Sequence, residues 1–112
     1  MRRLAMFHQL SNVHLAAAFD EGGVLLHGDD AYTPFADGLF DPQIAFTRGG
    51  VLVAADARIG RTYRIDSGKP RWRGDFTSPG PSLLAITPTT QLDEFATFTT
   101  DGKVTVYKLP AA

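Results

Sequence analysis

The sequence predicts an all-β protein in which an antiparallel meander of four short strands is repeated along one domain, residues 1–112. Segments rich in β-branched, aromatic and small apolar residues recur throughout the chain, and clusters of Gly, Asp, Ser and Pro separate them. The composition is 44% hydrophobic and 21% charged, which is typical of a soluble globular domain and excludes an extended disordered chain.

The first repeat covers approximately residues 3–40 and is the least regular of the three. Two apolar segments, LAMFHQL and VHLAAAF, precede a turn at Asp20-Glu21-Gly22-Gly23, and VLLHG follows it. The remaining segment, TPFADGLF, is irregular. We therefore expect three strands here and a poorly formed fourth segment.

The middle repeat, approximately residues 42–77, is the clearest. It contains the segments IAFT, VLVAA, RTYRI and RWRGDF, separated by turn-forming clusters that each include Gly. The small and β-branched residues of VLVAA suit a strand that is covered on both faces. In RWRGDF, alternation predicts Trp72, Gly74 and Phe76 on one face and the charged residues on the other.

The last repeat, approximately residues 81–109, contains SLLAITP, EFATFTT and KVTVYKL but no fourth strand. Asp101-Gly102 lies between two β-rich segments, and this dipeptide favours a two-residue type I′ turn. The Pro-rich segment 77–82 is expected to connect this repeat to the middle one, because proline is tolerated at such crossings.

Corresponding glycines give the repeat length. Gly23, Gly60 and Gly102 occupy equivalent turns, so the spacings are 60 − 23 = 37 and 102 − 60 = 42 residues. Both are close to the period of a β-propeller blade, in which a four-stranded meander is repeated around a central channel.

Two segments resemble known blade families. The last repeat, EFATFTTDGKVTVYKL, resembles the second and third strands of a WD-repeat blade, with Tyr107-Lys108 where such blades usually carry Trp-Asp. The middle repeat resembles a quinoprotein-type blade through Asp66, Ser67-Gly68-Lys69 and Trp72. The resemblance covers almost the whole chain and implies a partial β-propeller of about three blades.

The resemblance implies no cofactor and no enzymatic activity. The chain has no Gly-His dipeptide of the kind that precedes many WD-repeat blades, and the quinoprotein cofactor ligands are not among the matched positions. Serine-nucleophile motifs and phosphate-binding loops are also absent from the sequence. We predict a protein that is not an enzyme and needs no cofactor.

Three blades are too few for a closed ring, which needs typically four to eight. The prediction is therefore a scaffold or protein-interaction module that closes by forming a homo-oligomer or by recruiting a partner chain with further blades. A small β-barrel or a β-sandwich remains the alternative fold, because either manages its edges without partners.

The candidate binding residues lie in the basic middle repeat. Residues 48–75 carry a net charge of 7 − 3 = +4, whereas residues 1–47 carry 2 − 6 = −4. The candidate ligand or partner site consists of Arg58, Arg61, Arg64, Arg71, Trp72 and Arg73. Lectin-like or anion and nucleic-acid binding is the alternative function, because arginine binds phosphate and aromatic rings stack on bases or sugars. Alternation places Arg61 and Arg64 on opposite faces of their strand, which argues against one continuous binding site. We therefore expect Trp72 to be a residue that packs between blades.

Metal binding and membrane insertion are not predicted. His8, His14 and His27 lie near Asp20, Asp29 and Asp30 in the sequence, but their spacing matches no known ligand pattern. The chain has no cysteine, its formal charge is −1, and no apolar run is long enough to span a membrane. His8, His14 and neighbouring polar residues interrupt the N-terminal apolar segment, so we expect a cytoplasmic protein without a secretory signal.

Overall fold

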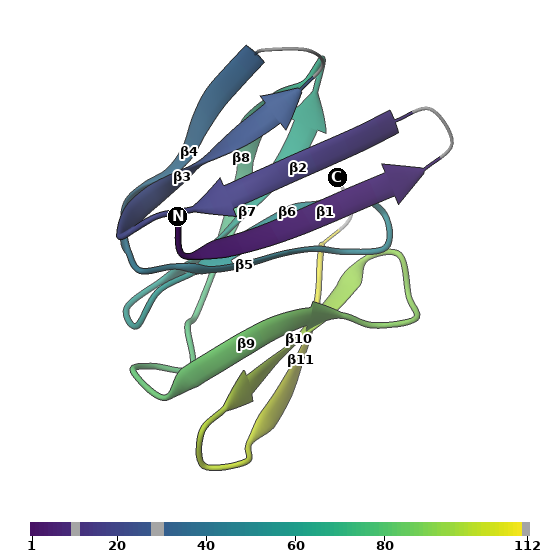
Figure 1. The fold of residues 1–112 in the computed structure, drawn as a ribbon. Helices are drawn as coiled ribbons and strands as arrows, with labels where there is room; N and C mark the ends of the chain where they lie inside the picture. Colours follow the sequence, from purple (N-terminus) through teal and green to yellow (C-terminus); the bar gives the residue numbers. More distant parts are fainter. Residues whose placement is uncertain (10–11, 28–30, 111–112) are drawn as a thin grey trace.

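The computed structural model describes residues 1–9, 12–27 and 31–110, which form three antiparallel sheets (Figure 1). The first sheet has the order β1 (Arg3–Gln9), β2 (Asn12–Ala18), β3 (Glu21–His27) and β4 (Ala31–Phe40). The second has the order β5 (Gln43–Phe46), β6 (Leu52–Ala55), β7 (Gly60–Asp66) and β8 (Lys69–Phe76). The third has the order β11 (Val104–Lys108), β10 (Glu94–Thr99) and β9 (Leu83–Pro88).

This arrangement confirms the prediction of an all-β protein made of antiparallel meanders. None of the three sheets in the described part is closed into a barrel. The segment predicted to be irregular is a strand, β4, but its backbone is distorted at Ala36 and Gly38, where φ is 59° and 81°. The third sheet contains three strands among the described residues.

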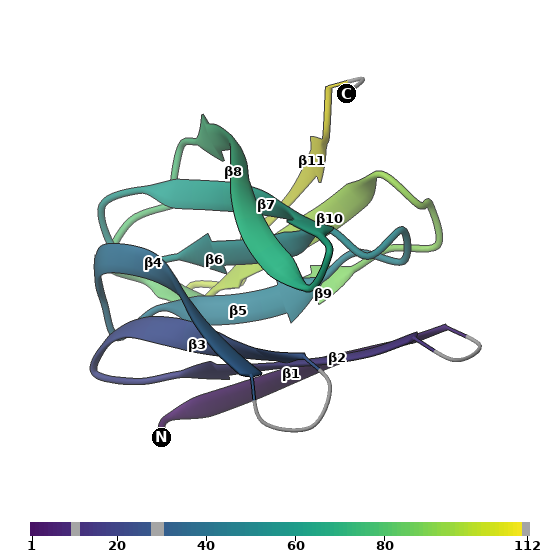
Figure 2. The ribbon, with the colours of Figure 1, turned by 90° about the horizontal axis from the view of Figure 1, so that it is seen from above.

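The three sheets are stacked, and their first strands lie side by side. β1 contacts β5, and β5 contacts β9. These three strands run in the same direction, and the second sheet lies between the other two (Figure 2). Each sheet is continuous in sequence, so the chain completes one sheet before it begins the next.

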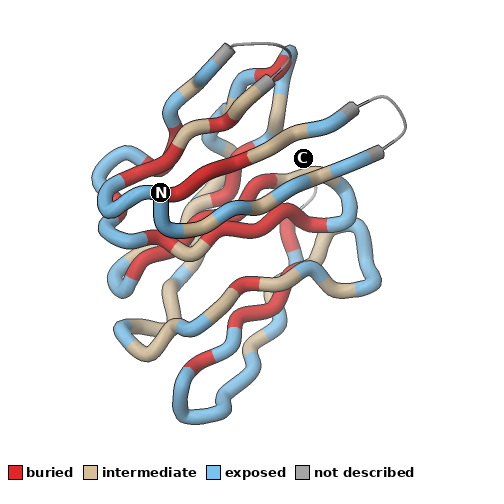
Figure 3. The backbone as a smooth tube through the Cα atoms, in the orientation of Figure 1, coloured by how far each residue is buried: buried red, intermediate tan, exposed pale blue. Residues whose placement is uncertain are grey.

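The second sheet is covered on both faces, as the composition of VLVAA predicts. Leu52 and Ala54 of β6 pack against the first sheet, in a cluster that includes Leu25 and Phe35. Val53 and Ala55 face the opposite way and pack in a second cluster that includes Phe95. All four residues of β6 are buried, which is visible as an unbroken red segment in the centre of the molecule (Figure 3).

A β-bulge overturns the predicted alternation in β8. Tyr63 pairs with Trp72, but Thr62 pairs with Gly74, so Arg73 is an extra residue in the ladder. Paired residues share a face, and a bulge shifts the alternation by one position. Trp72 therefore lies on the face directed at the first sheet, whereas Phe76 packs in the cluster with the third sheet.

The turn between β10 and β11 also differs from the prediction. Gly102 has φ of 87°, but Asp101 does not have a positive φ, which a type I′ turn would require. Backbone N–H groups of Thr99 and Gly102 donate to the carbonyl oxygens of Lys103 and Thr99, respectively, at 3.0 Å each. The hairpin loop therefore contains three residues, with the glycine in its left-handed position.

Candidate functional site

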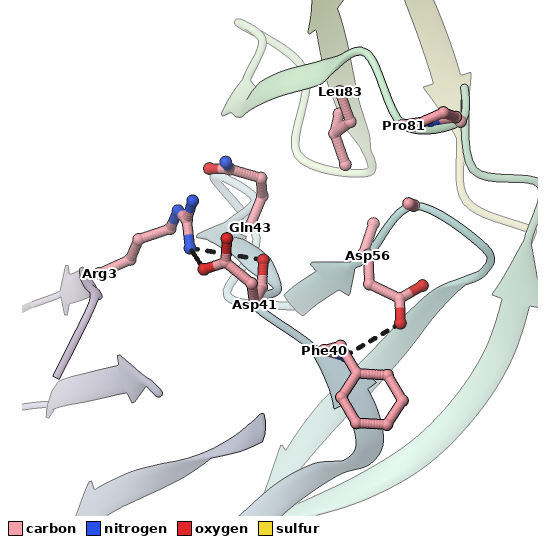
Figure 4. A pocket seen from close by; sticks show the side chains of 10 residues that line it. Arg3, Phe40, Asp41, Gln43, Asp56, Pro81 and Leu83 are labelled. Atoms are coloured by element: carbon pink, nitrogen blue, oxygen red, sulfur yellow. Dashed lines mark hydrogen bonds and ion pairs between the residues drawn. The ribbon is translucent and has the colours of Figure 1, made fainter. Parts of the chain in front are cut away.

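A pocket of about 230 Å³ lies where the first strands of the three sheets begin. Arg3, Gln43 and Leu83 are the first residues of β1, β5 and β9, and all three line it. Asp41 and Asp56 line it as well (Figure 4). All three sheets meet at this pocket, so its polar side chains come from segments far apart in the sequence.

The Arg3–Asp41 pair connects the first two sheets at this pocket. The Arg3 guanidinium forms an ion pair with the Asp41 carboxylate and donates to the Asp41 and Pro42 carbonyl oxygens at 3.4 and 3.3 Å. Arg2 Nε donates to the same carboxylate at 3.2 Å. Hydrogen bonds from Arg3 and Arg2 lower the pKa of the Asp41 carboxyl below its ordinary value. The pair fixes the start of β1 against the chain that enters β5.

Asp56 is buried beside this pocket and is fully engaged in hydrogen bonds. Its carboxylate accepts backbone N–H donors from Phe40 at 3.0 Å, Arg58 at 2.8 Å and Ile59 at 2.9 Å. The Arg58 side chain adds a fourth donor at 3.0 Å. Burial by itself raises the pKa of the Asp56 carboxyl, but hydrogen bonds from Ile59, Phe40 and Arg58 outweigh it and lower the pKa to about 2.

The carboxylates at this pocket therefore serve the fold. Each carboxylate is held by arginine or backbone donors, and the donors come from segments far apart in the sequence, such as Phe40 to Asp56. We assign the pocket a structural role, because its acidic groups are occupied by partners within the chain.

A second pocket, of about 450 Å³, lies between the outer strands of the first and second sheets. Trp72 lines it with its side chain 66% exposed, so the prediction that Trp72 is packed is wrong. Its indole Nε1 donates to Asp75 Oδ1 at 2.8 Å, and Arg61 donates to the Asp37 carbonyl oxygen at 2.7 Å. The Tyr63 hydroxyl accepts the Ala36 N–H at 3.0 Å and so helps to hold the distorted part of β4.

The predicted site residues divide between two faces of the second sheet. Arg61 shares a face with Tyr63 and Trp72, at the pocket just described. Arg64 pairs with Arg71 on the opposite face, as alternation predicts for Arg61 and Arg64. The structure therefore does not bring the six residues of the predicted site into one surface.

The other members of the predicted set have partners within the chain. Arg58 binds Asp56 and the Gly38 carbonyl oxygen and lies 5.0 Å from the centre of the Phe40 ring. Arg71 forms an exposed ion pair with Asp66 at 3.5 Å. The Arg73 side chain donates to the Pro110 carbonyl oxygen. These contacts explain part of the basic cluster as structural.

The outer face of the first sheet is apolar and exposed. Strand register places Leu4, Met6 and Val13 on the face that points away from the second sheet. Tyr32 of β4 joins them through its pairing with Leu26. The exposed fraction is 66% for Met6 and at least half for the other three exposed residues, Leu4, Val13 and Tyr32.

The outer face of the third sheet has the same character. Phe98 pairs with Val104, Ala96 pairs with Val106, and all four side chains point away from the second sheet. Val104 and Val106 are 54% and 58% exposed. Contiguous apolar patches on a sheet face mark interaction surfaces in soluble proteins. The sequence analysis predicted that three blades cannot close a ring, but it did not identify the residues of these outer faces.

Within the described residues, no group of three or more His, Cys, Asp or Glu side chains is placed to hold a metal ion. Asp29 and Asp30 lie outside those residues. The described part also contains no helix long and apolar enough to cross a membrane.

Comparisons with protein-family models, curated proteins and solved structures gave no match for this chain.

Proposed function

We propose that this chain is a non-enzymatic interaction module, a partial propeller whose first and third sheets pack against another copy to complete a ring. The observation that carries the proposal is the pair of apolar outer faces, Leu4, Met6, Val13 and Tyr32 at one end and Phe98, Val104 and Val106 at the other. Both faces of the second sheet are already buried in this way, each against a neighbouring sheet.

A second copy suits these faces because the contact needed already occurs twice within the chain. The first sheet packs on the second, and the second packs on the third, with the first strands side by side. If the third sheet of one copy packs on the first sheet of another, the same relation continues. Two copies then provide 3 + 3 = 6 sheets, within the roughly four to eight blades of closed propellers.

The test is the mass in solution of the full chain and of two face variants, Met6→Lys and Val106→Lys. We expect the wild-type chain to have a multiple of the 12.1 kDa monomer mass and each of the two variants to lose the closed assembly. Leu92→Lys is the control, because Leu92 is equally exposed but lies in the loop between β9 and β10. A wild-type chain that remains monomeric at high concentration contradicts the proposal.

Mixing the two variants tests the head-to-tail arrangement. The Met6→Lys chain retains an intact third-sheet face, and the Val106→Lys chain retains an intact first-sheet face. An equimolar mixture should therefore form one junction, giving a dimer that neither variant forms alone. If like faces paired with like, each variant alone would still dimerise through its intact face.

A second candidate function is lectin-like binding of a small ligand at the Trp72 pocket, and the exposure of the indole ring favours it. An exposed Trp beside Arg61, Asp37 and Asp75 offers a stacking surface with charged groups at its rim. The test is a glycan-binding screen of the wild type and Trp72→Ala. Binding that is lost in Trp72→Ala while the mass is unchanged supports this function, and no binding to any glycan contradicts it.

A further inference from the structure

Among the described residues, the third sheet has an unpaired edge at the position where the other two sheets have a fourth strand. β4 pairs with β3 and β8 pairs with β7, whereas β11 pairs only with β10 among the described residues. An unpaired edge presents a row of N–H and C=O groups that can hydrogen-bond to another strand. This feature concerns the edge of the sheet, so it is separate from the outer faces used in ring assembly.

The register identifies the backbone groups that this edge offers. Leu109 N–H donates to the Asp93 carbonyl at 2.7 Å, and Thr99 N–H donates to the Lys103 carbonyl at 3.0 Å. Residues 103, 105, 107 and 109 therefore direct their backbone groups at β10. Because these groups alternate in antiparallel pairs, Val104, Val106 and Lys108 direct theirs outward. The exposed edge can pair with an extended segment.

Two basic side chains and one carboxylate lie at one end of this edge. Arg73, Lys108 and Asp75 line a pocket of about 120 Å³ that also contains Phe76, Phe95 and Tyr107. The face of β7 and β8 that is turned toward the third sheet carries Arg64 and Arg71 further along. Lys69 pairs with Asp66 on that same face. With Arg73, this face has four cationic side chains and one carboxylate, which favours an acidic partner.

Apolar side chains follow the remainder of the edge. Val104 and Val106 point to the outer side of β11, where a residue on a paired strand would contact them. Tyr107 points to the other side, with its hydroxyl donating to the Thr77 carbonyl at 2.9 Å. In a strand added here, every second residue contacts the two valines, and the residues between them point toward the basic face.

We propose that the edge of β11 binds an extended segment of a partner protein in which apolar and acidic residues alternate. Main-chain hydrogen bonds to Val104, Val106 and Lys108 provide the pairing, and Arg73 with the basic face of β7 and β8 selects carboxylates. A second copy of this chain is a poorer occupant, because pairing two β11 edges brings Lys103 and Lys108 of both copies to the same edge. Like charges at that edge oppose the pairing.

The first experiment measures binding of a fluorescent peptide of alternating Val and Glu, eight residues long as β8 is. A peptide of alternating Val and Lys is the matched control. We expect saturable binding of the acidic peptide and slower amide exchange at Val104, Val106 and Lys108 on its addition. Equal binding of both peptides, absence of binding, or protection elsewhere overturns the proposal.

Two variants separate backbone pairing from charge. Val106→Pro removes an outward N–H that β10 does not use, and Val106→Ala removes side-chain atoms but keeps that N–H. We expect the proline variant to abolish binding and the alanine variant to retain it. Arg73→Glu, which reverses a charge on the side that the acidic residues face, should weaken binding about tenfold. Unchanged binding by Val106→Pro contradicts the edge pairing.

One further result would assign the edge to a second copy instead. In that case the amides of Val104, Val106 and Lys108 would be protected in concentrated protein without peptide and would lose this protection on dilution. Ring assembly is measured by mass and peptide binding by anisotropy, so each proposal can fail without the other.

Discussion

The second sheet and the two end sheets use similar sequences in different surroundings. β6 is buried on both faces, whereas β1 and β11 are only partly buried on the face toward the second sheet and carry exposed apolar residues on the other. A strand that is apolar on both sides is stable only when both sides are covered. The exposed apolar residues of the end sheets are therefore suited to a further covering sheet, as the second sheet already has on both sides.

The largest effect is expected from two phenylalanines on one strand. Phe95 is 1% exposed and packs between the second and third sheets, and Phe98 is 37% exposed on the outer face. Phe95→Ala should lower the free energy of unfolding by about 3–5 kcal/mol through the cavity it leaves. Phe98→Ala should cost less than half as much in monomeric protein. Urea denaturation measures both, and equal losses would remove the distinction between the two faces.

The second sheet should also be intolerant of added volume. A Cβ atom on Gly60 would lie 2.3 Å from the Phe76 ring, which is packed between sheets. Gly60→Ala should therefore lower the free energy of unfolding by about 1–3 kcal/mol. Gly74→Ala is the control, because its nearest neighbour is Thr62 Oγ1 at 4.0 Å. If the two variants unfold at the same urea concentration, the close approach at Gly60 does not affect the free energy of unfolding.

A pH-dependent effect is expected at Asp56, which joins the second sheet to the end of β4. Its carboxyl pKa is about 2 in the folded protein and 3.8 ordinarily, so the folded state favours the charged form. This stabilisation is present above about pH 4 and is lost as the pH falls toward 2. The difference corresponds to about 2 kcal/mol.

Asp56→Asn should remove this acid sensitivity and destabilise the protein at neutral pH, where Phe40, Arg58 and Ile59 lose a charged acceptor. Urea unfolding of the wild type and variant between pH 2 and pH 7 measures the change. The assignment is wrong if both proteins lose stability in parallel between pH 4 and 2.

The smallest effect is expected at Trp72, which is a large exposed side chain on the second sheet, like those on the outer faces of the end sheets. Because the indole is 66% exposed, Trp72→Ala should change the free energy of unfolding by less than about 0.5 kcal/mol. A packed Trp would cost several times more. Thermal unfolding of the variant distinguishes the two, and a large loss would show that Trp72 is covered in solution.

The sheets were predictable from sequence because turn glycines and apolar segments follow local rules. VLVAA revealed a strand covered on both faces, and Arg61 and Arg64 were placed on opposite faces by alternation. The orientation of Trp72 was not predictable in this way. One extra residue at Arg73 reverses every later side chain, and nothing in the composition of RWRGDF indicates the bulge.

The polar contacts at the first-strand pocket were also missed, for a different reason. Arg3 and Asp41 are 41 − 3 = 38 residues apart, and Asp56 accepts a hydrogen bond from Phe40 across two sheets. Such pairs depend on how the sheets stack rather than on local sequence. The exposed apolar faces were predictable only in part. Alternation divides the residues of a strand into two faces, but it does not show which face is exposed until the inner face is known.

The continuity of each sheet in sequence has a consequence for how the chain folds. Among the described residues, the most widely separated ladder partners are Glu21 and Phe40, which are 40 − 21 = 19 positions apart. Strand pairing therefore closes only short loops, unlike the long loops of most β-sandwiches. We expect hairpins to form first within each sheet and the stacking of sheets to follow, so that core substitutions between sheets mainly accelerate unfolding.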